Sequence, residues 1–225
     1  EIIMKRITLS LFLIVVANIM SAQVHPFGVS QALDTITTSK LTAVYLYTIK
    51  TEDAEGQPVT DSISLALQVG DGMWKCTPYD RHLILLGRNE ELDKAWWKYM
   101  VQECLMHVPT IVTNYPEDKI TSHEAVMTFC FKVVEDKKPI KWKILDESST
   151  VCGYACKSAV GDFHGKTWNV QYTEEVPTSA GPWKLGGLPG LITSATDSEG
   201  IHSFVLTNLM VESTPLTYEK FYIVN

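Results

Sequence analysis

Short stretches of alternating apolar and polar residues dominate the chain after residue 40 and predict β-strands. Residues 41–50 (LTAVYLYTIK) are rich in β-branched and aromatic side chains, and residues 62–69 (SISLALQV) place every second side chain, from Ile63 to Val69, on one apolar face. The glycines of residues 70–72 predict a tight turn, and the strand after it is expected at residues 74–79. Further strands are predicted at residues 125–134, 140–145, 151–162, 166–173, 190–195 and 202–208, with a hairpin turn at 197–200.

One segment changes to helical spacing. In residues 90–107, apolar side chains such as Leu92, Trp96 and Met100 recur every three or four positions, and Asn89 precedes them as a candidate N-cap. The sequence therefore predicts a mainly β, α+β domain: an antiparallel sheet system with one main helix near residues 90–107.

The first residues have the pattern of a secretory signal peptide. Lys5 and Arg6 are followed by an apolar stretch and then by small residues that end at Ala22. Residues 1–3 precede Met4 and are interpreted as an artefact of the assigned gene start. We therefore expect a signal peptide at residues 1–22, cleaved near Ala22, and a single domain at residues 23–225, which is long enough for one hydrophobic core.

Charge and composition narrow the partners and the compartment. The net charge is −7 and there is no run of Lys and Arg, which argues against nucleic acid as a partner. No later apolar stretch is long enough to cross a bilayer, so the protein is not expected to be an integral membrane protein. Five cysteines leave at least one thiol unpaired within a monomer, and their pairing is left open.

Candidate catalytic and metal-binding residues are few. Cys104 and His107 are three residues apart on the predicted helix and could face one metal ion, but a buried thiol and a histidine near a helix C-terminus explain them more simply. The acidic pair Glu174 and Glu175 could act as acid and base, but is interpreted as a solvated strand end. There is no HExxH, GxSxG or P-loop motif, so no catalytic residue, metal or cofactor is predicted.

The segment GPWKLGGLPGLI (residues 181–192) combines helix-breaking residues with leucines. Pro189 excludes a helix interior and a central strand, and the apolar residues argue against a solvated loop. We expect Gly187 and Gly190 to take positive φ or to let another backbone approach closely, with Pro189 and Gly190 suited to a type II turn. Two interpretations remain: a stiff sheet corner that packs on Trp183, or the mouth of a ligand site.

This segment resembles the motif that names the GLPGLI family, exported proteins of Bacteroidetes. Similar blocks follow in order along the chain: LQVG at residues 67–70, TNYP at 113–116, IKWKI at 140–144, GYACKSA at 153–159, FHG at 163–165 and YTEEVP at 172–177. Lys166 and residues 169–171 depart from the usual pattern, so a ligand that those positions bind in other members could be bound differently here.

The resemblance implies a curved antiparallel sheet, a bowl or half-barrel, related to the N-terminal domain of some secreted peptide-N-glycosidases. It also implies a location in the periplasm or at the outer membrane or cell exterior, and a possible partner in an outer-membrane TonB-dependent transporter or another envelope protein. We therefore expect an exported, non-catalytic binding or accessory protein. The alternatives are a hydrolase or metal-dependent enzyme acting on glycans or peptides, and a purely structural assembly factor.

Residue roles follow from the same resemblance and from strand parity. An unknown small ligand is expected to contact residues of the motif and of the strand before it, namely Trp183, Leu188, Pro189, Leu191 and Tyr172. Structural roles are expected for Gly181, Pro182, Gly187, Gly190, Tyr154 and Cys156. Cys156 is expected to point inward from its strand, sharing a face with Tyr154 and Ser158.

Overall fold

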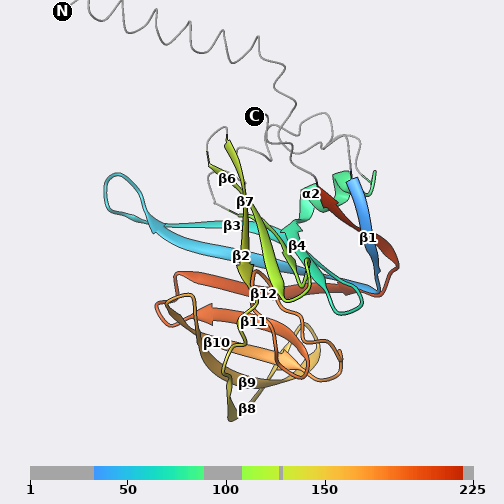
Figure 1. Cartoon of the computed structure of the whole chain (residues 1–225). Helices are drawn as coiled ribbons and strands as arrows, with labels where there is room; N and C mark the ends of the chain where they lie inside the picture. The colour runs from blue at the N-terminus through green and yellow to red at the C-terminus, as the bar shows by residue number, and fades with distance from the viewer. Residues whose placement is uncertain (1–32, 89–107, 127–128, 220–225) are drawn as a thin grey trace, which may run out of the picture.

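The computed structural model describes residues 33–88, 108–126 and 129–219 and confirms a mainly β fold with one short helix, α2 (Figure 1). The predicted signal peptide, the predicted helix near residues 90–107 and the pair Cys104 and His107 lie outside the described residues. The elements are β1 (Leu33–Ser39), β2 (Leu41–Glu52), β3 (Pro58–Val69), β4 (Trp74–Pro78), α2 (Tyr79–Leu85), β5 (Thr110–Thr113), β6 (Lys119–Val126), β7 (Phe129–Asp136), β8 (Lys143–Val151), β9 (Tyr154–Phe163), β10 (Lys166–Thr173), β11 (Leu191–Asp197), β12 (His202–Met210) and β13 (Thr214–Glu219).

Eleven of the strands form one antiparallel sheet in the order β7-β6-β5-β4-β3-β2-β12-β11-β10-β9-β8. The sheet is strongly curved, because residues from its two ends meet. Glu135 on β7 lies 3.5 Å from the imidazole of His164 (Nε2 to Oε2), in the turn between β9 and β10, although eight strands separate β7 from β9. The pairing registers shift in the β10–β11, β12–β2 and β8–β9 pairs, and such bulges bend a sheet.

The inner face of the curved sheet carries the hydrophobic core. The predicted apolar face of β3 is confirmed: Leu65, Leu67 and Val69 are buried there, and Ile63 packs against them. Residues of β10 face the same core, among them Trp168 and Val170. The polypeptide between β7 and β8 crosses this inner side, since Trp142 packs against the core and its indole N–H donates a hydrogen bond to the Gly186 carbonyl at 2.9 Å.

A second, two-stranded sheet of β1 and β13 packs against the large sheet at Gln68, Lys75 and His123, which lie on β3, β4 and β6. Contacts between these layers include buried polar side chains. Lys75 donates to the Thr217 carbonyl at 3.0 Å, and Gln68 donates to the Thr214 hydroxyl, also at 3.0 Å. Alternate residues of one strand thus face an apolar and a polar interior, so all five residues of β4 (WKCTP) are buried although its apolar and polar side chains alternate.

Several element boundaries differ from the predictions. The segment 125–134, expected to be one strand, spans the end of β6 and most of β7, which pair as a hairpin. The sequence analysis missed β1, β5, β13 and α2, because short polar strands and a seven-residue helix have little periodicity. The strand predicted at residues 166–173 has the observed bounds, and the predicted turn at 197–200 joins β11 to β12.

Cys156 is buried on β9, as expected, with 2% of its surface exposed, but Ala159, which has the opposite parity on this strand, is the residue that belongs to the main hydrophobic core. The sulfur of Cys156 lies 3.2 Å from the Thr193 hydroxyl oxygen, and Tyr154 begins the same strand. Cys76, Cys152 and Cys156 are free thiols. Cys152 is exposed in the turn before β9, so it is turned away from the buried Cys156.

Within the described residues, no helix has the length and apolar character that crossing a bilayer requires.

Candidate ligand-binding pocket

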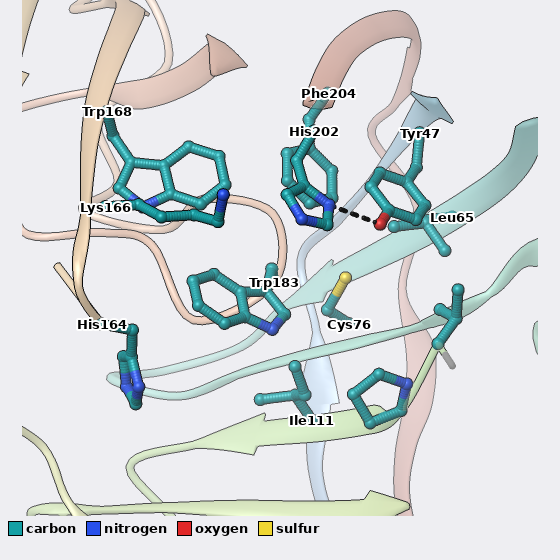
Figure 2. Close-up of a pocket in the computed structure, with 12 residues that line it drawn as sticks. Tyr47, Leu65, Cys76, Ile111, His164, Lys166, Trp168, Trp183, His202 and Phe204 are labelled. Carbon is teal, nitrogen blue, oxygen red and sulfur yellow. Dashed lines mark hydrogen bonds between the residues drawn. The ribbon is translucent and has the colours of Figure 1, made fainter. Parts of the chain in front are cut away.

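A pocket of about 260 Å³ opens on the inner face of the sheet (Figure 2). Strands from both halves of the sheet build it, and residues 108–109 and the 181–187 loop complete it. Its aromatic lining residues are Tyr47, Trp168, Trp183 and Phe204, and its aliphatic ones are Leu65, Val108, Pro109 and Ile111. The polar lining residues are Cys76, His164, Lys166 and His202.

The aromatic side chains form a continuous wall. The ring centroids of Tyr47 and Phe204 are 4.7 Å apart, those of Phe204 and Trp168 are 6.0 Å apart, and those of Trp168 and Trp183 are 5.7 Å apart. These separations are in the range in which aromatic side chains pack favourably on one another. The pocket therefore offers ring faces and edges over much of its surface.

Two polar side chains face the pocket together. The Tyr47 hydroxyl and the Nδ1 atom of His202 are 2.9 Å apart and share a hydrogen bond (Figure 2). Burial raises the pKa of Tyr47 to about 12, and the nearby Asp197 adds to this effect. Burial also lowers the pKa of His202, with Lys166 acting in the same direction. Both groups are therefore neutral at neutral pH.

The formal charge of Lys166 is paired. Its ammonium donates to the carboxylate of Asp197 at 2.7 Å and to that of Glu199 at 3.3 Å, and these bonds raise the pKa of Lys166. Burial by itself would raise the pKa of Asp197, but the hydrogen bonds from Lys166 and from the backbone N–H groups of His202 and Ile201 outweigh it, so the pKa is lowered. The ionised Asp197 thus fixes both Lys166 and the start of β12.

Cys76 is a neutral thiol. Burial raises its pKa to about 12, although a hydrogen bond with the Trp183 backbone acts in the opposite direction. A thiolate is the nucleophilic form of cysteine, so this side chain contributes a small apolar surface rather than a reactive group.

The loop at residues 180–187 places Trp183 in the pocket. It is closed by a hydrogen bond from the Gly187 N–H to the Ser179 carbonyl at 2.8 Å and by a bridge between Ala180 and Gly186. Trp183 has φ of 54°, a left-handed conformation that bulky residues rarely adopt. The backbone thus holds an unfavourable conformation at the residue whose ring faces the pocket.

The glycines of this loop are required by close packing. A Cβ atom on Gly181 would lie 2.9 Å from the Ile192 side chain, and one on Gly186 would lie 2.7 Å from the Ser179 carbonyl oxygen. Pro182 is buried beside them. Gly187 has φ of 92°, so it takes the positive φ expected of one of these glycines.

Gly190 meets the other expectation, a close approach of another backbone segment. A Cβ atom there would lie 2.1 Å from the Thr173 carbonyl oxygen, so this glycine permits a close approach of two backbones. The type II turn suggested for Pro189 and Gly190 would need positive φ at Gly190, but the residue does not have it. That prediction was wrong: the close packing of Gly190 against the Thr173 backbone, and not a left-handed φ, requires glycine at this position.

The structure places only one of the five residues predicted to contact a ligand in the pocket. Trp183 lines it, whereas Tyr172, Leu188 and Leu191 are 2%, 2% and 0% exposed in the hydrophobic core, and Pro189 is exposed outside the pocket. The expectation that the leucines form a ligand mouth is therefore corrected: they fill the core beneath the sheet. Sequence reasoning missed Tyr47 and His202. His164 was noted only within the FHG block, and Lys166 only as a departure from the family pattern.

His164 connects the pocket to the edge of the sheet. With Gly165 it forms the turn between β9 and β10, where both residues have positive φ (50° and 75°), the pattern of a type I′ hairpin. Its ring centroid is 5.4 Å from that of Trp183, and Glu135 also forms an ion pair with Lys184. His164 also lines a second hollow of about 450 Å³, which the charged residues Glu135, Asp136, Lys138 and Asp162 border.

No protein-family model and no curated protein matches the chain. Two solved structures of PNGF-II, in space groups C2 and P21, are similar to it. The first is 15% identical with a TM-score of 0.48 and the second 14% identical with a TM-score of 0.47, and each comparison covers 80% of this chain. The chain spans only 28% and 29% of the length of these PNGF-II chains. Both are partial structural similarities and assign the chain to no family.

Proposed function

We propose that the chain is an exported member of the GLPGLI family that binds a small ligand in its aromatic pocket and carries out no chemistry on it. The observation that carries the proposal is the pocket itself. It is lined by four aromatic side chains, and its polar groups are neutral or already paired with opposite charge. An apolar concave site with a few convergent polar groups is typical of a small-molecule site.

The side chains that line this site are poor nucleophiles at neutral pH. The Cys76 thiol and the Tyr47 phenol both have a pKa of about 12, so neither supplies an anionic nucleophile at neutral pH. No group of three or more His, Cys, Asp or Glu side chains within the described part of the chain is arranged to hold a metal ion. These features favour binding over the alternative of a hydrolase or metal-dependent enzyme acting on glycans or peptides.

The family resemblance supports the remaining parts of the proposal. A signal peptide at residues 1–22 would direct the protein to the periplasm or the outer surface of a bacterium. There, an outer-membrane transporter or another envelope protein would be its partner, and the pocket would deliver or present the ligand to it. The purely structural alternative would leave the pocket without an occupant.

The proposal can be tested by extracting the bound molecule. The full chain is expressed with export in a Bacteroidetes host, purified without denaturation, unfolded in organic solvent, and the released compounds are identified by mass spectrometry. Trp183→Ala is purified in parallel, with Glu174→Gln as a matched variant at an exposed site outside the pocket. We expect one or a few compounds in the parent and in Glu174→Gln that are depleted in Trp183→Ala. Equal recovery from all three proteins, or no compound in any, would refute a ligand-binding role for this pocket.

A further inference from the structure

We propose that the pocket takes a neutral bicyclic aromatic ring, about the size of indole, that carries one hydrogen-bonding group. This inference rests on the proposed function and adds the chemical class of the ligand. It follows from the size of the pocket, its walls, its charge and its hydrogen-bonding groups.

The volume sets the size of the ring. An engineered apolar cavity of about 150 Å³ in another protein binds benzene. The pocket here has about 260 Å³, which is larger than one six-membered ring needs and matches two fused rings. A ligand much larger than this would have to extend out of the pocket.

The walls determine the shape of the ligand. Trp183 and Trp168 lie at one side and Phe204 and Tyr47 continue the series of rings, so a flat guest meets aromatic faces or edges in succession. Aromatic pairs at such distances gain interaction beyond simple burial of area. A fused aromatic ring uses this surface fully, whereas a flexible alkyl chain would lose conformational freedom without that gain.

The charges exclude an ionised guest. Lys166, the lining residue with a permanent formal charge, is already bonded to Asp197 and Glu199. A carboxylate or ammonium group placed among the rings would lose its hydration without gaining an unpaired partner of opposite charge, which is unfavourable. The part of the ligand inside the pocket is therefore neutral.

Tyr47 and His202 determine the polar group. Whichever of the two atoms donates the hydrogen bond between them, a neutral imidazole and a phenol that share one bond leave one donor and one acceptor unused. One polar atom on the ring, such as an indole N–H, is paired by this couple. A sugar ring carries hydroxyl groups on all sides and would bury several of them against the aromatic and aliphatic lining without partners, which argues against a saccharide.

The test compares five probes by calorimetry and ligand-observed NMR on the full chain at pH 7.5. They are indole, its carbocyclic counterpart indene, charged indole-3-acetate, methyl α-glucoside, and the capped tripeptide acetyl-Ala-Trp-Ala-amide. We expect indole to bind with a Kd below about 1 mM, a reasonable limit for nine non-hydrogen atoms. Indole-3-acetate should bind at least about tenfold more weakly, and methyl α-glucoside should not bind.

Tyr47→Phe isolates the hydrogen bond because it keeps the ring. It should weaken indole binding about three- to tenfold and leave indene binding unchanged. Tyr154→Phe makes the same chemical change outside the pocket and should alter neither. Thermal unfolding of both variants establishes that they are folded before binding is measured.

The tripeptide distinguishes two sources of the ring. If it binds as tightly as indole, the ring enters as a tryptophan side chain of a partner, and if indole alone binds, the natural ligand is a free small molecule. Either result supports the ring class. Tighter binding of methyl α-glucoside or indole-3-acetate than of indole, or no binding by any probe, overturns it. Recovery of a compound of another class in the extraction experiment would then leave the proposed function standing, whereas its failure as well would reject both.

Discussion

The two halves of the segment GPWKLGGLPGLI have different roles although they are adjacent in sequence. The first half brings Trp183 into the pocket on a loop whose backbone is held in an unfavourable conformation. The second half buries Leu188, Leu191 and Ile192 in the core, and Gly190 lets its backbone pass close to Thr173. One continuous motif thus contains both a ligand contact and a segment that packs in the core. Substitutions can therefore affect one role without the other.

The largest effect is expected in the structural half. Gly190→Val would place a branched side chain where even a Cβ atom lies 2.1 Å from the Thr173 carbonyl oxygen. We expect a loss of about 3 kcal/mol or more in the free energy of unfolding, and a melting temperature lower by about 10 °C, from thermal unfolding followed by circular dichroism. Pro189→Ala, at the exposed neighbouring position, is the control and should change stability by less than about 1 kcal/mol. Equal melting temperatures of Gly190→Val and the parent would show that the close backbone approach at Gly190 is not required for stability.

Substitutions of Trp183 should affect the pocket more than the fold. Trp183→Ala removes a half-buried ring and should reduce stability by about 2 kcal/mol, with loss of ligand binding. Trp183→Gly should also lose binding but be about 0.5–1 kcal/mol more stable than Trp183→Ala, because glycine accepts φ of 54° without strain. Chemical denaturation at one protein concentration measures the difference. If Trp183→Gly is the less stable variant, the backbone at this residue is not strained.

The pocket should also respond to pH, and the structural half should not. The pKa of His202 is lowered below its ordinary value near 6.5, so the imidazole is neutral at pH 7 and gains a proton only as the pH falls further. A protonated His202 would have both ring nitrogens as donors and a charge beside an apolar guest. We expect indole affinity to be constant between pH 8 and 7 and to fall toward pH 5. Calorimetry across this range tests the expectation, and an affinity that rises on acidification would contradict it.

The smallest effect is expected at the exposed acidic pair. Glu174 forms an ion pair with Lys157 at 2.9 Å, and both side chains are solvent-exposed. Such pairs contribute little to stability, so Glu174→Gln should change the melting temperature by no more than about 1 °C and leave ligand binding unaffected. A loss of binding in this variant would move the functional site from the pocket to the strand end.

Local patterns were sufficient to predict much of the sheet. Strands such as β3 and β10 alternate clearly because one face of each meets a single hydrophobic core. The strand β4 (WKCTP) alternates too and was predicted, with Lys75 meeting the β1–β13 sheet and Cys76 facing the pocket. The burial of its polar side chains was not predicted, because alternation along one strand does not show that a second layer covers the polar face.

The pocket was much harder to predict than the sheet. Tyr47, Lys166 and His202 lie on β2, β10 and β12, and only the pairing of β2 with β12 brings the first and last of these together. No local pattern marks a tyrosine whose partner is 155 residues away in sequence. Trp183 was identified because it belongs to an unusual local sequence, and Leu188 and Leu191 were assigned to the ligand because adjacency in sequence was taken for adjacency in space.

The strand order has a consequence for how the chain folds. Followed from β2, every neighbour in the large sheet is the next strand in sequence until β7, and from β8 the same holds until β12. The chain is therefore an up-and-down meander that closes on itself where β12 pairs with β2 and is open at one seam, between β7 and β8. Within this sheet, the β12–β2 pairing alone joins strands more than 100 residues apart, for example Phe204 with Tyr47, and bears the largest loop-closure entropy. We expect the hydrogen bonds of this closing pair to form last during refolding, so the Tyr47–His202 couple and the binding of its guest should appear only after the hairpins on either side are protected from hydrogen exchange.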